Sequence, residues 1–227
     1  MTNVSQLIID TEPSDPPTAA DAFLAMQKQK KNRKVYRTRR HFAEQAVYLF
    51  EKKGFSATTI DEISTLADYS TSTFFRHFSD KEEVLFFDYY DRMEEFQSIF
   101  GSPNHSDPWL AVQSTFIVFA KIWDGDADKL GIRRFRLIHR EPVLYNRFLA
   151  KAADWEVLMS DMLKQHFTDT ASAELVSSVI AGAASAAFRA GCKVKVKSRK
   201  KTLSLAKCVE DAFQALEHLG RLTEGAT

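Results

Sequence analysis

The sequence has only two cysteines, Cys192 and Cys208, and they do not belong to any cluster of metal-ligating residues. So few cysteines give neither a disulfide framework nor a thiolate metal site, and we expect both to be reduced thiols. Eight glycines and six prolines in 227 residues are too few for a low-complexity chain, whereas 18 phenylalanines and three tryptophans are too many for a wholly disordered one. The composition therefore indicates a folded protein.

Long apolar runs are also missing. The longest uncharged stretch in the C-terminal half, 175–188, has 14 residues and includes Ser and Gly. A membrane-spanning helix needs roughly 18 to 20 apolar residues. The first residues, MTNVSQLIIDTEPSDPP, lack the basic start and apolar core of a secretory signal. We therefore expect a cytoplasmic protein with no membrane segment.

The motifs of common enzymes are absent as well. The sequence has no glycine-rich phosphate loop, no G-x-S-x-G and no His or Cys residues at metal-ligand spacing. Asp124, Asp126 and Asp128 have the spacing of the first ligands of a calcium loop. However, Lys129 and Phe135 stand where such a loop requires Gly and Glu. We therefore expect no enzymatic activity, no cofactor and no metal site.

Charge is distributed unevenly, although the net charge is only +1. Residues 1–27 carry four acids and no bases, whereas residues 28–40 carry eight bases and no acids. A second basic segment, KVKVKSRKK at 193–201, adds six bases. Basic runs attract polyanions such as nucleic acid or anionic lipid, and the alternative is that they form a solvated tail and a solvated loop.

Helical signals dominate the N-terminal half. Prolines among Ser, Thr and Asp predict disorder over residues 1 to about 30, and helical spacing of apolar residues predicts a first helix from Thr38 to the glycine stop at Gly54. TIDE at 59–62 reads as a capping box for a short helix over about 60–67. Ser70 would cap a second short helix, 71–77, and SDKE at 79–82 would open a long helix that ends near residue 100.

The C-terminal half continues in the same way. GSPNHSDP at 101–108 predicts a connection, and apolar residues at helical spacing follow over 109–123, 144–162, 175–190 and 205–219. The fold class is therefore all-α. We divide the chain into an acidic and then basic extension (1–34), a helix-turn-helix domain (35–100) and a helical C-terminal domain (101–227).

Two short helices joined by a tight turn and flanked by longer helices form a helix-turn-helix arrangement. The second short helix has no acids and is small enough to enter a DNA major groove. The predicted helix starts at Thr59 and Ser79 would offer backbone N–H groups to phosphates, with Lys81 in the first turn of the latter. The side chains expected on the exposed face of the second short helix are Thr71, Ser72, Thr73, Phe75, Arg76 and His77.

The run GFSATTIDEISTLADYSTSTFFRHFSDKEEVL, 54–85, resembles the N-terminal domain of TetR/AcrR-type transcriptional regulators. The resemblance implies that Thr59, His77 and Lys81 bind phosphates and that residues 71–73 face bases. Arg76 would face a base or the DNA backbone, and Phe74 and Phe78 would be core residues. It also places the start of the first helix against DNA, so that Arg37, Arg39 and Arg40 reach phosphates. The preceding basic residues would form an arm that adds to DNA affinity, unless they are only a flexible tail.

The chain departs from the family pattern at three positions. Asp68 stands where the family usually has Gly, Tyr69 where it has Val, and Phe75 where it often has Tyr. Phe75 has no hydroxyl to donate to phosphate, so its contact with DNA would be apolar, for example with a thymine methyl. For Asp68 we expect a carboxylate that accepts a hydrogen bond from a backbone N–H of the turn.

For the C-terminal domain the resemblance implies a ligand cavity and a dimer interface. Aromatic residues would line an apolar pocket for a small effector, although plain core is the alternative: Trp109, Phe116, Phe119, Trp123 and Trp155. Small residues over 181–187 and an amphipathic segment, 203–219, favour a four-helix interface between two subunits, unless they pack within one monomer. The candidate interface residues are Ala183, Ala187, Val209, Phe213 and Leu216.

The sequence therefore predicts a homodimeric regulator that binds double-stranded DNA sequence-specifically. We expect a repressor that a small, largely apolar ligand releases from an inverted-repeat operator. The alternative is a helical DNA-organising or protein-interaction factor that uses the same helix-turn-helix without an effector.

Overall fold

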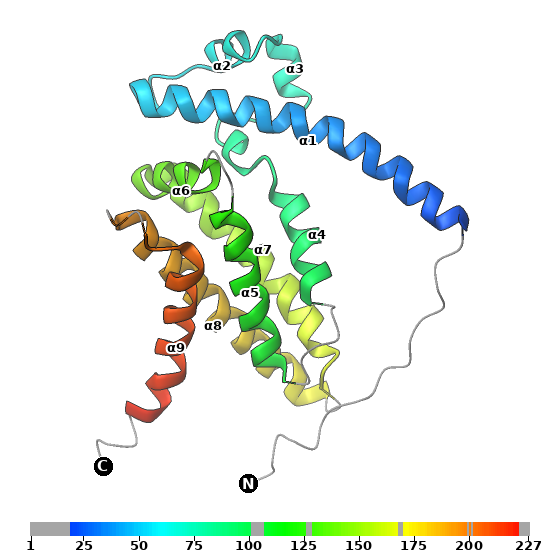
Figure 1. Cartoon of the computed structure of the whole chain (residues 1–227), viewed down its shortest axis with the longest axis vertical. Coiled ribbons are helices and arrows are strands. Elements are labelled where there is room, and N and C mark those ends of the chain that lie inside the picture. Colours follow the sequence, from blue (N-terminus) through cyan, green and yellow to red (C-terminus); the bar gives the residue numbers. More distant parts are fainter. Residues whose placement is uncertain are drawn as a thin grey trace. The chain divides into compact units, whose positions relative to one another are not determined.

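The computed structural model describes residues 19–100, 107–125, 129–167, 170–198, 200 and 202–222, and all regular secondary structure among them is helical (Figure 1). The all-α prediction is confirmed. The chain forms two compact units, one ending at Arg92 and the other beginning at Met93.

The first unit contains α1 (Ala19–Lys53), α2 (Ile60–Leu66), α3 (Thr71–Phe75) and a 3-10 helix, η2 (Glu83–Phe86), and it includes the start of α4 (Tyr89–Phe100). Its core is aromatic. Phe42 of α1 meets Phe74 and Phe78 edge to face, with ring centroids 5.4 and 6.0 Å apart. All three side chains are buried, as predicted for Phe74 and Phe78. This cluster holds α3 against α1.

Helix α1 begins at Ala19, well before the predicted start at Thr38. Residues 19–34 contain no Gly or Pro and are rich in Ala, Lys and Gln, which have high helix propensity. The prolines on which the expectation of disorder rested all precede Ala19, so they do not interrupt this helix. The basic residues 28–40 therefore lie on a helix rather than on an extended arm, and residues 1–18 of the predicted extension fall outside the described residues.

The predicted long helix from residue 79 to 100 is interrupted, and the predicted capping box at Ser79 is absent. Ser79 Oγ donates to the Asp80 carboxylate, and Asp80 Oδ1 accepts from Glu83 N–H at 2.9 Å. The 3-10 helix η2 follows, and α4 begins only at Tyr89. All residues from 84 to 89 are buried. In a helix, successive side chains point to different sides of the helix axis. Because every residue from 84 to 89 is buried, other parts of the protein must surround this segment on all sides.

The turn between α2 and α3 contains Asp68 at a φ of 57°, in the left-handed region. Its backbone N–H donates to Thr65 O, and Tyr69 N–H donates to Ser64 O. The predicted hydrogen bond from a backbone N–H to the Asp68 carboxylate is absent among the described residues. The left-handed conformation explains why the resembling family usually has Gly at this position, since Gly adopts it without a Cβ clash.

The second unit continues with α5 (Pro108–Asp124), α6 (Leu130–Arg140), α7 (Pro142–Lys164), α8 (Thr170–Lys197) and α9 (Leu205–Leu222). Helix α8 packs against both α7 and α9, and α5 packs against α9. Two carboxylates cap helices here. Asp107 accepts from the N–H groups of Trp109 and Leu110 at the start of α5, and Asp124 accepts from those of Leu205 and Ala206 at the start of α9.

Helix α8 is long and apolar enough, over Ser172–Lys197, to cross a membrane by length and composition alone. However, it places Ala181, Ala184 and Ala187 in the core of the second unit. A Cβ atom at Gly191 would lie 2.9 Å from the backbone of Cys208 and Val209, so α8 and α9 approach closely there. These contacts are those of a core helix in a helical bundle.

Two substitutions at Asp68 test the left-handed turn. Asp68→Gly should raise the free energy of unfolding by up to about 1 kcal/mol, and Asp68→Ala should lower it by about 1 kcal/mol, because a Cβ is disfavoured at positive φ and Ala has no local hydrogen bond to offer. Both variants remove the same carboxylate, so they differ only in backbone preference. Urea unfolding measures the difference, and equal shifts in both variants would contradict the strained turn.

Candidate nucleic-acid interface

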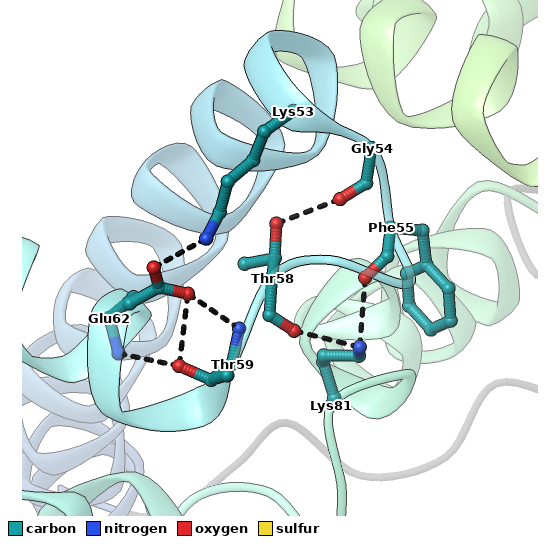
Figure 2. Close-up of polar contacts among 7 residues, drawn as sticks. All are labelled: Lys53, Gly54, Phe55, Thr58, Thr59, Glu62 and Lys81. Carbon is teal, nitrogen blue, oxygen red and sulfur yellow. Dashed lines mark hydrogen bonds and ion pairs between the residues drawn. The ribbon is translucent and has the colours of Figure 1, made fainter.

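The start of α2 is fixed by a reciprocal capping box, as the sequence predicted (Figure 2). Thr59 Oγ1 accepts from Glu62 N–H at 3.2 Å, and Glu62 Oε2 accepts from Thr59 N–H at 2.8 Å. Lys53, at the end of α1, forms an ion pair with Glu62. The hydrogen bonds from Lys53 and then Thr59 lower the pKa of Glu62 to about 2. The carboxylate is therefore ionised and compensated, which suits the positive end of a helix.

Lys81 spans from the segment after α3 to the loop before α2 (Figure 2). Its Nζ donates to the carbonyl oxygens of Phe55 and Thr58, both at 2.8 Å, and lies 4.2 Å from the centroid of the Phe55 ring. An ammonium group has three N–H donors, so one remains for another acceptor. Lys81 thus positions the start of α2, and its contact with phosphate stays a prediction.

Helix α3 is joined to α2 by side chains that were predicted to face DNA. Ser70 caps α3 by accepting from Thr73 N–H at 3.2 Å. Thr71 Oγ1 donates to Asp61 Oδ1 at 2.8 Å, and Thr73 Oγ1 accepts from Arg76 Nη2 at 3.0 Å. Thr71 and Thr73 are therefore engaged within the unit in this structure.

The outer face of α3 carries Ser72, Phe75 and Arg76, which are all exposed. Phe75 is 54% exposed, which is unusual for a large aromatic side chain. His77 is half-buried, and burial, followed by the charges of Arg39 and Arg76, lowers its pKa. Its imidazole is therefore mostly neutral at pH 7 and offers a single N–H donor. This face combines a hydroxyl, a guanidinium and an apolar ring.

The three arginines of α1 differ in their surroundings. Arg37 is exposed. The Arg39 guanidinium carbon lies 5.5 Å from the centroid of the Phe78 ring, and Arg40 Nε donates to Glu44 Oε1 at 2.9 Å. Their phosphate contacts stay predictions.

The aromatic residues predicted to line a pocket fall into two neighbouring groups. The Phe119 ring lies 5.6 Å from Trp123 and 5.5 Å from Trp155, measured between ring centroids. Trp109 and Phe116 instead meet at Phe213, at 5.5 and 5.9 Å. Phe116 and Phe119 are buried, whereas the three tryptophans pack around the core and are only partly buried.

The predicted dimer residues are not all at the surface. Ala187, Val209 and Phe213 are buried in the core of the single chain, so they do not face solvent. Ala183 and Leu216 are half-exposed. An exposed apolar stripe instead runs along α8 through Leu175, Val179, Gly182 and Ala186.

Sequence reasoning missed the basic residues of α6. Arg133, Arg136 and Arg140 recur at helical spacing in LGIRRFRLIHR, so the signal was present, but we identified no helix over these residues. They lie beside the basic end of α8.

Two family models match the chain. The model "Bacterial regulatory proteins, tetR family" matches residues 43–86, and the model "MftR C-terminal domain" matches residues 106–219. Together they span the helix-turn-helix and most of the second unit.

Individual proteins agree with these models. The HTH-type transcriptional regulator TcmR of Streptomyces glaucescens is 30% identical over 132 residues, which are 56% of this chain and 58% of TcmR. The match therefore spans little more than half of TcmR. Two solved structures share the fold: SmeT with triclosan (18% identity, TM-score 0.56, 79% of this chain and 90% of SmeT) and FadR of Bacillus subtilis with stearoyl-CoA (13%, 0.52, 78% and 96%).

The helix-turn-helix with its capped α2 and outward-facing α3, followed by a helical domain that also matches a family model, shows that the chain belongs to the TetR family of bacterial transcriptional regulators.

Proposed function

We propose that this regulator is a cytoplasmic, homodimeric repressor that binds an inverted-repeat operator and leaves it when a small, largely apolar ligand binds. The outer face of α3 carries the proposal, because Ser72, Phe75 and Arg76 are exposed there on a helix fixed at both ends. Surface residues with no packing role, on a helix of the size that enters a major groove, are suited to base contacts.

The surroundings of α3 support its approach to DNA. Of the two acids in the first turn of α2, Glu62 is paired with Lys53, which offsets the repulsion between its charge and phosphates. Asp61 is held at the start of α3 by the hydrogen bond from Thr71. In the proposed complex, Arg76 and Ser72 contact base edges, and Phe75 contacts a thymine methyl. The N–H groups at the start of α2, together with Arg37, contact the phosphate backbone.

Two observations support an effector: the aromatic residues of the second unit and the ligands in similar solved structures. Phe119, Trp123 and Trp155 form a connected set of rings, and the similar structures of SmeT and FadR hold triclosan and stearoyl-CoA. A ligand that enters this set releases DNA only if it binds more tightly to the form that cannot bind the operator. If no apolar compound changed operator affinity, the alternative factor without an effector would be favoured.

The dimer is proposed from the exposed stripe on α8. Leu175 and Val179 are 69% and 61% exposed, and Gly182 and Ala186 continue the same face with small side chains. An apolar stripe of this kind suits close packing against a second copy through α8 and α9, with Ala183 and Leu216 at its border. The buried Ala187, Val209 and Phe213 would support these helices from the core side.

Arg76→Ala and Ser72→Ala should each weaken operator binding about tenfold or more, because a lost base contact typically costs about 1–3 kcal/mol. Neither should lower the melting temperature much, because both side chains are exposed. Fluorescence anisotropy with DNA selected from a random pool by the wild-type protein measures the affinity. Lys121→Ala, which removes an exposed base from α5, is the control for net charge. Unchanged affinity in both α3 variants would remove this helix from the interface.

Val179→Arg should convert the dimer into a monomer, because an arginine on the α8 stripe would be buried without a partner in the interface. The matched control is Val157→Arg on α7, since Val157 is 63% exposed and Val179 is 61% exposed. Sedimentation velocity at micromolar concentration compares the two. A monomeric wild-type protein, or dimers in both variants, would contradict the proposed interface.

A further inference from the structure

A groove with a volume of about 1260 Å³ lies within the second unit. It is lined by the end of α5, by α6, by the start of α7, by the end of α8 and by described residues of the connection from α8 to α9. Eight of its lining residues are lysines or arginines, contributed mainly by α6 and by the basic segment at the end of α8. Four lysines of the second basic segment thus line a concave site, and the first three lie on α8 rather than in a loop: Lys193, Lys195, Lys197 and Lys200.

Among the described residues that line the groove, acidic side chains do not balance this charge. Asp124 is the single acid among the lining residues, and its two carboxylate oxygens accept the N–H groups of Leu205 and Ala206 at 2.8 and 2.9 Å. Its negative charge is therefore directed at the start of α9. Arg136, Lys193 and Lys197 are exposed, and none of them forms an ion pair with a residue that the structure describes.

The walls of the groove are also held in place. Lys195 donates its ammonium N–H to the carbonyl oxygen of Leu203, which joins the end of α8 to the connection that follows it. The Asp124 cap fixes the other end of this connection. Because these bonds lie within the protein itself, the backbone needs little rearrangement for the basic side chains to bind one ligand together.

One part of the groove is apolar. Trp123, Ile132, Tyr145 and Val196 belong to its lining together with the bases. Apolar side chains beside a cluster of bases suit a ligand that has both an anionic chain and an apolar or aromatic body.

We propose that this groove binds a small organic polyphosphate, with its phosphate chain on Arg136, Lys193 and Lys197 and its organic body against Trp123 and Tyr145. The concave shape favours a small ligand over duplex DNA, which is a rigid rod too wide to enter a site lined from five segments. The lining residues belong to the second unit, whereas α3 belongs to the first, and the proposed ligand binding does not depend on operator binding. Only Trp123 is shared with the aromatic residues proposed for the effector.

Calorimetry on the full chain with sodium tripolyphosphate and with ATP tests the site. Both should bind with one site per chain, and ATP should bind more tightly because it adds an organic body. The triple variant Arg136→Gln/Lys193→Gln/Lys197→Gln should bind both at least tenfold more weakly. The control triple Lys121→Gln/Lys164→Gln/Lys207→Gln removes the same charge from the same unit outside the groove, and it should stay within twofold of wild type.

Tyr145→Ala should remove the advantage of ATP over tripolyphosphate and leave tripolyphosphate binding unchanged. Equal losses in the two triple variants would mean that only net charge attracts phosphate, and the proposal would fail. It would also fail if neither compound bound saturably, or if the groove triple changed nothing but the salt dependence of operator binding, because the groove would then be a DNA contact.

Melting curves provide an independent measurement. Tripolyphosphate should raise the melting temperature of the wild type more than sodium chloride of equal ionic strength, because it binds the folded state. The groove triple should melt higher than wild type without ligand, since it has lost like-charge repulsion, and it should gain nothing from tripolyphosphate. A groove triple that unfolds at a lower temperature but responds to tripolyphosphate as the wild type does would overturn the site.

Discussion

A helix of five residues cannot hold its shape in water, so α3 depends on the burial of Phe74 against Phe42 and Phe78. This aromatic contact seats α3 on α1 and leaves Ser72 and Arg76 on the opposite side. Polar bonds then fix its orientation: Ser70 caps its start, and Thr71 ties it to Asp61 of α2. The exposed face is thus set by contacts within the first unit.

Several polar residues that the sequence alone would assign to contacts with DNA form hydrogen bonds within the protein. Thr59 and Glu62 cap each other, and Lys81 bonds to the carbonyls of Phe55 and Thr58. A polar side chain near a helix start serves a cap and a phosphate equally well by residue type alone. Residue type therefore does not show whether such a side chain is hydrogen-bonded within the protein or can contact DNA. The interatomic distances show this. Preorganisation of this kind lowers the entropy lost when a ligand binds.

Local signals predicted much of the fold, and long-range contacts decided what they missed. The capping box at Thr59 and the Gly54 stop are set by neighbouring residues, so they were visible in the sequence. The interruption before Tyr89 was not, because it depends on a segment enclosed on all sides. Long-range contacts also decide which surface covers the apolar face of α9. Its amphipathic pattern identified Val209 and Phe213 as apolar, but the pattern does not say whether a partner or the chain's own core covers them.

In the proposed complex, the starts of α2 and α3 and the outer face of α3 form the surface that reads DNA. Hydrogen–deuterium exchange with and without selected operator DNA tests it residue by residue, because amides at a helix start are protected when phosphates accept their hydrogen bonds. We expect slower exchange at Ile60 and Asp61, whose N–H groups do not take part in the capping box, and at residues 70–77, and no such protection with unrelated DNA at moderate salt. Protection elsewhere in the chain, with unchanged exchange in these two segments, would contradict it.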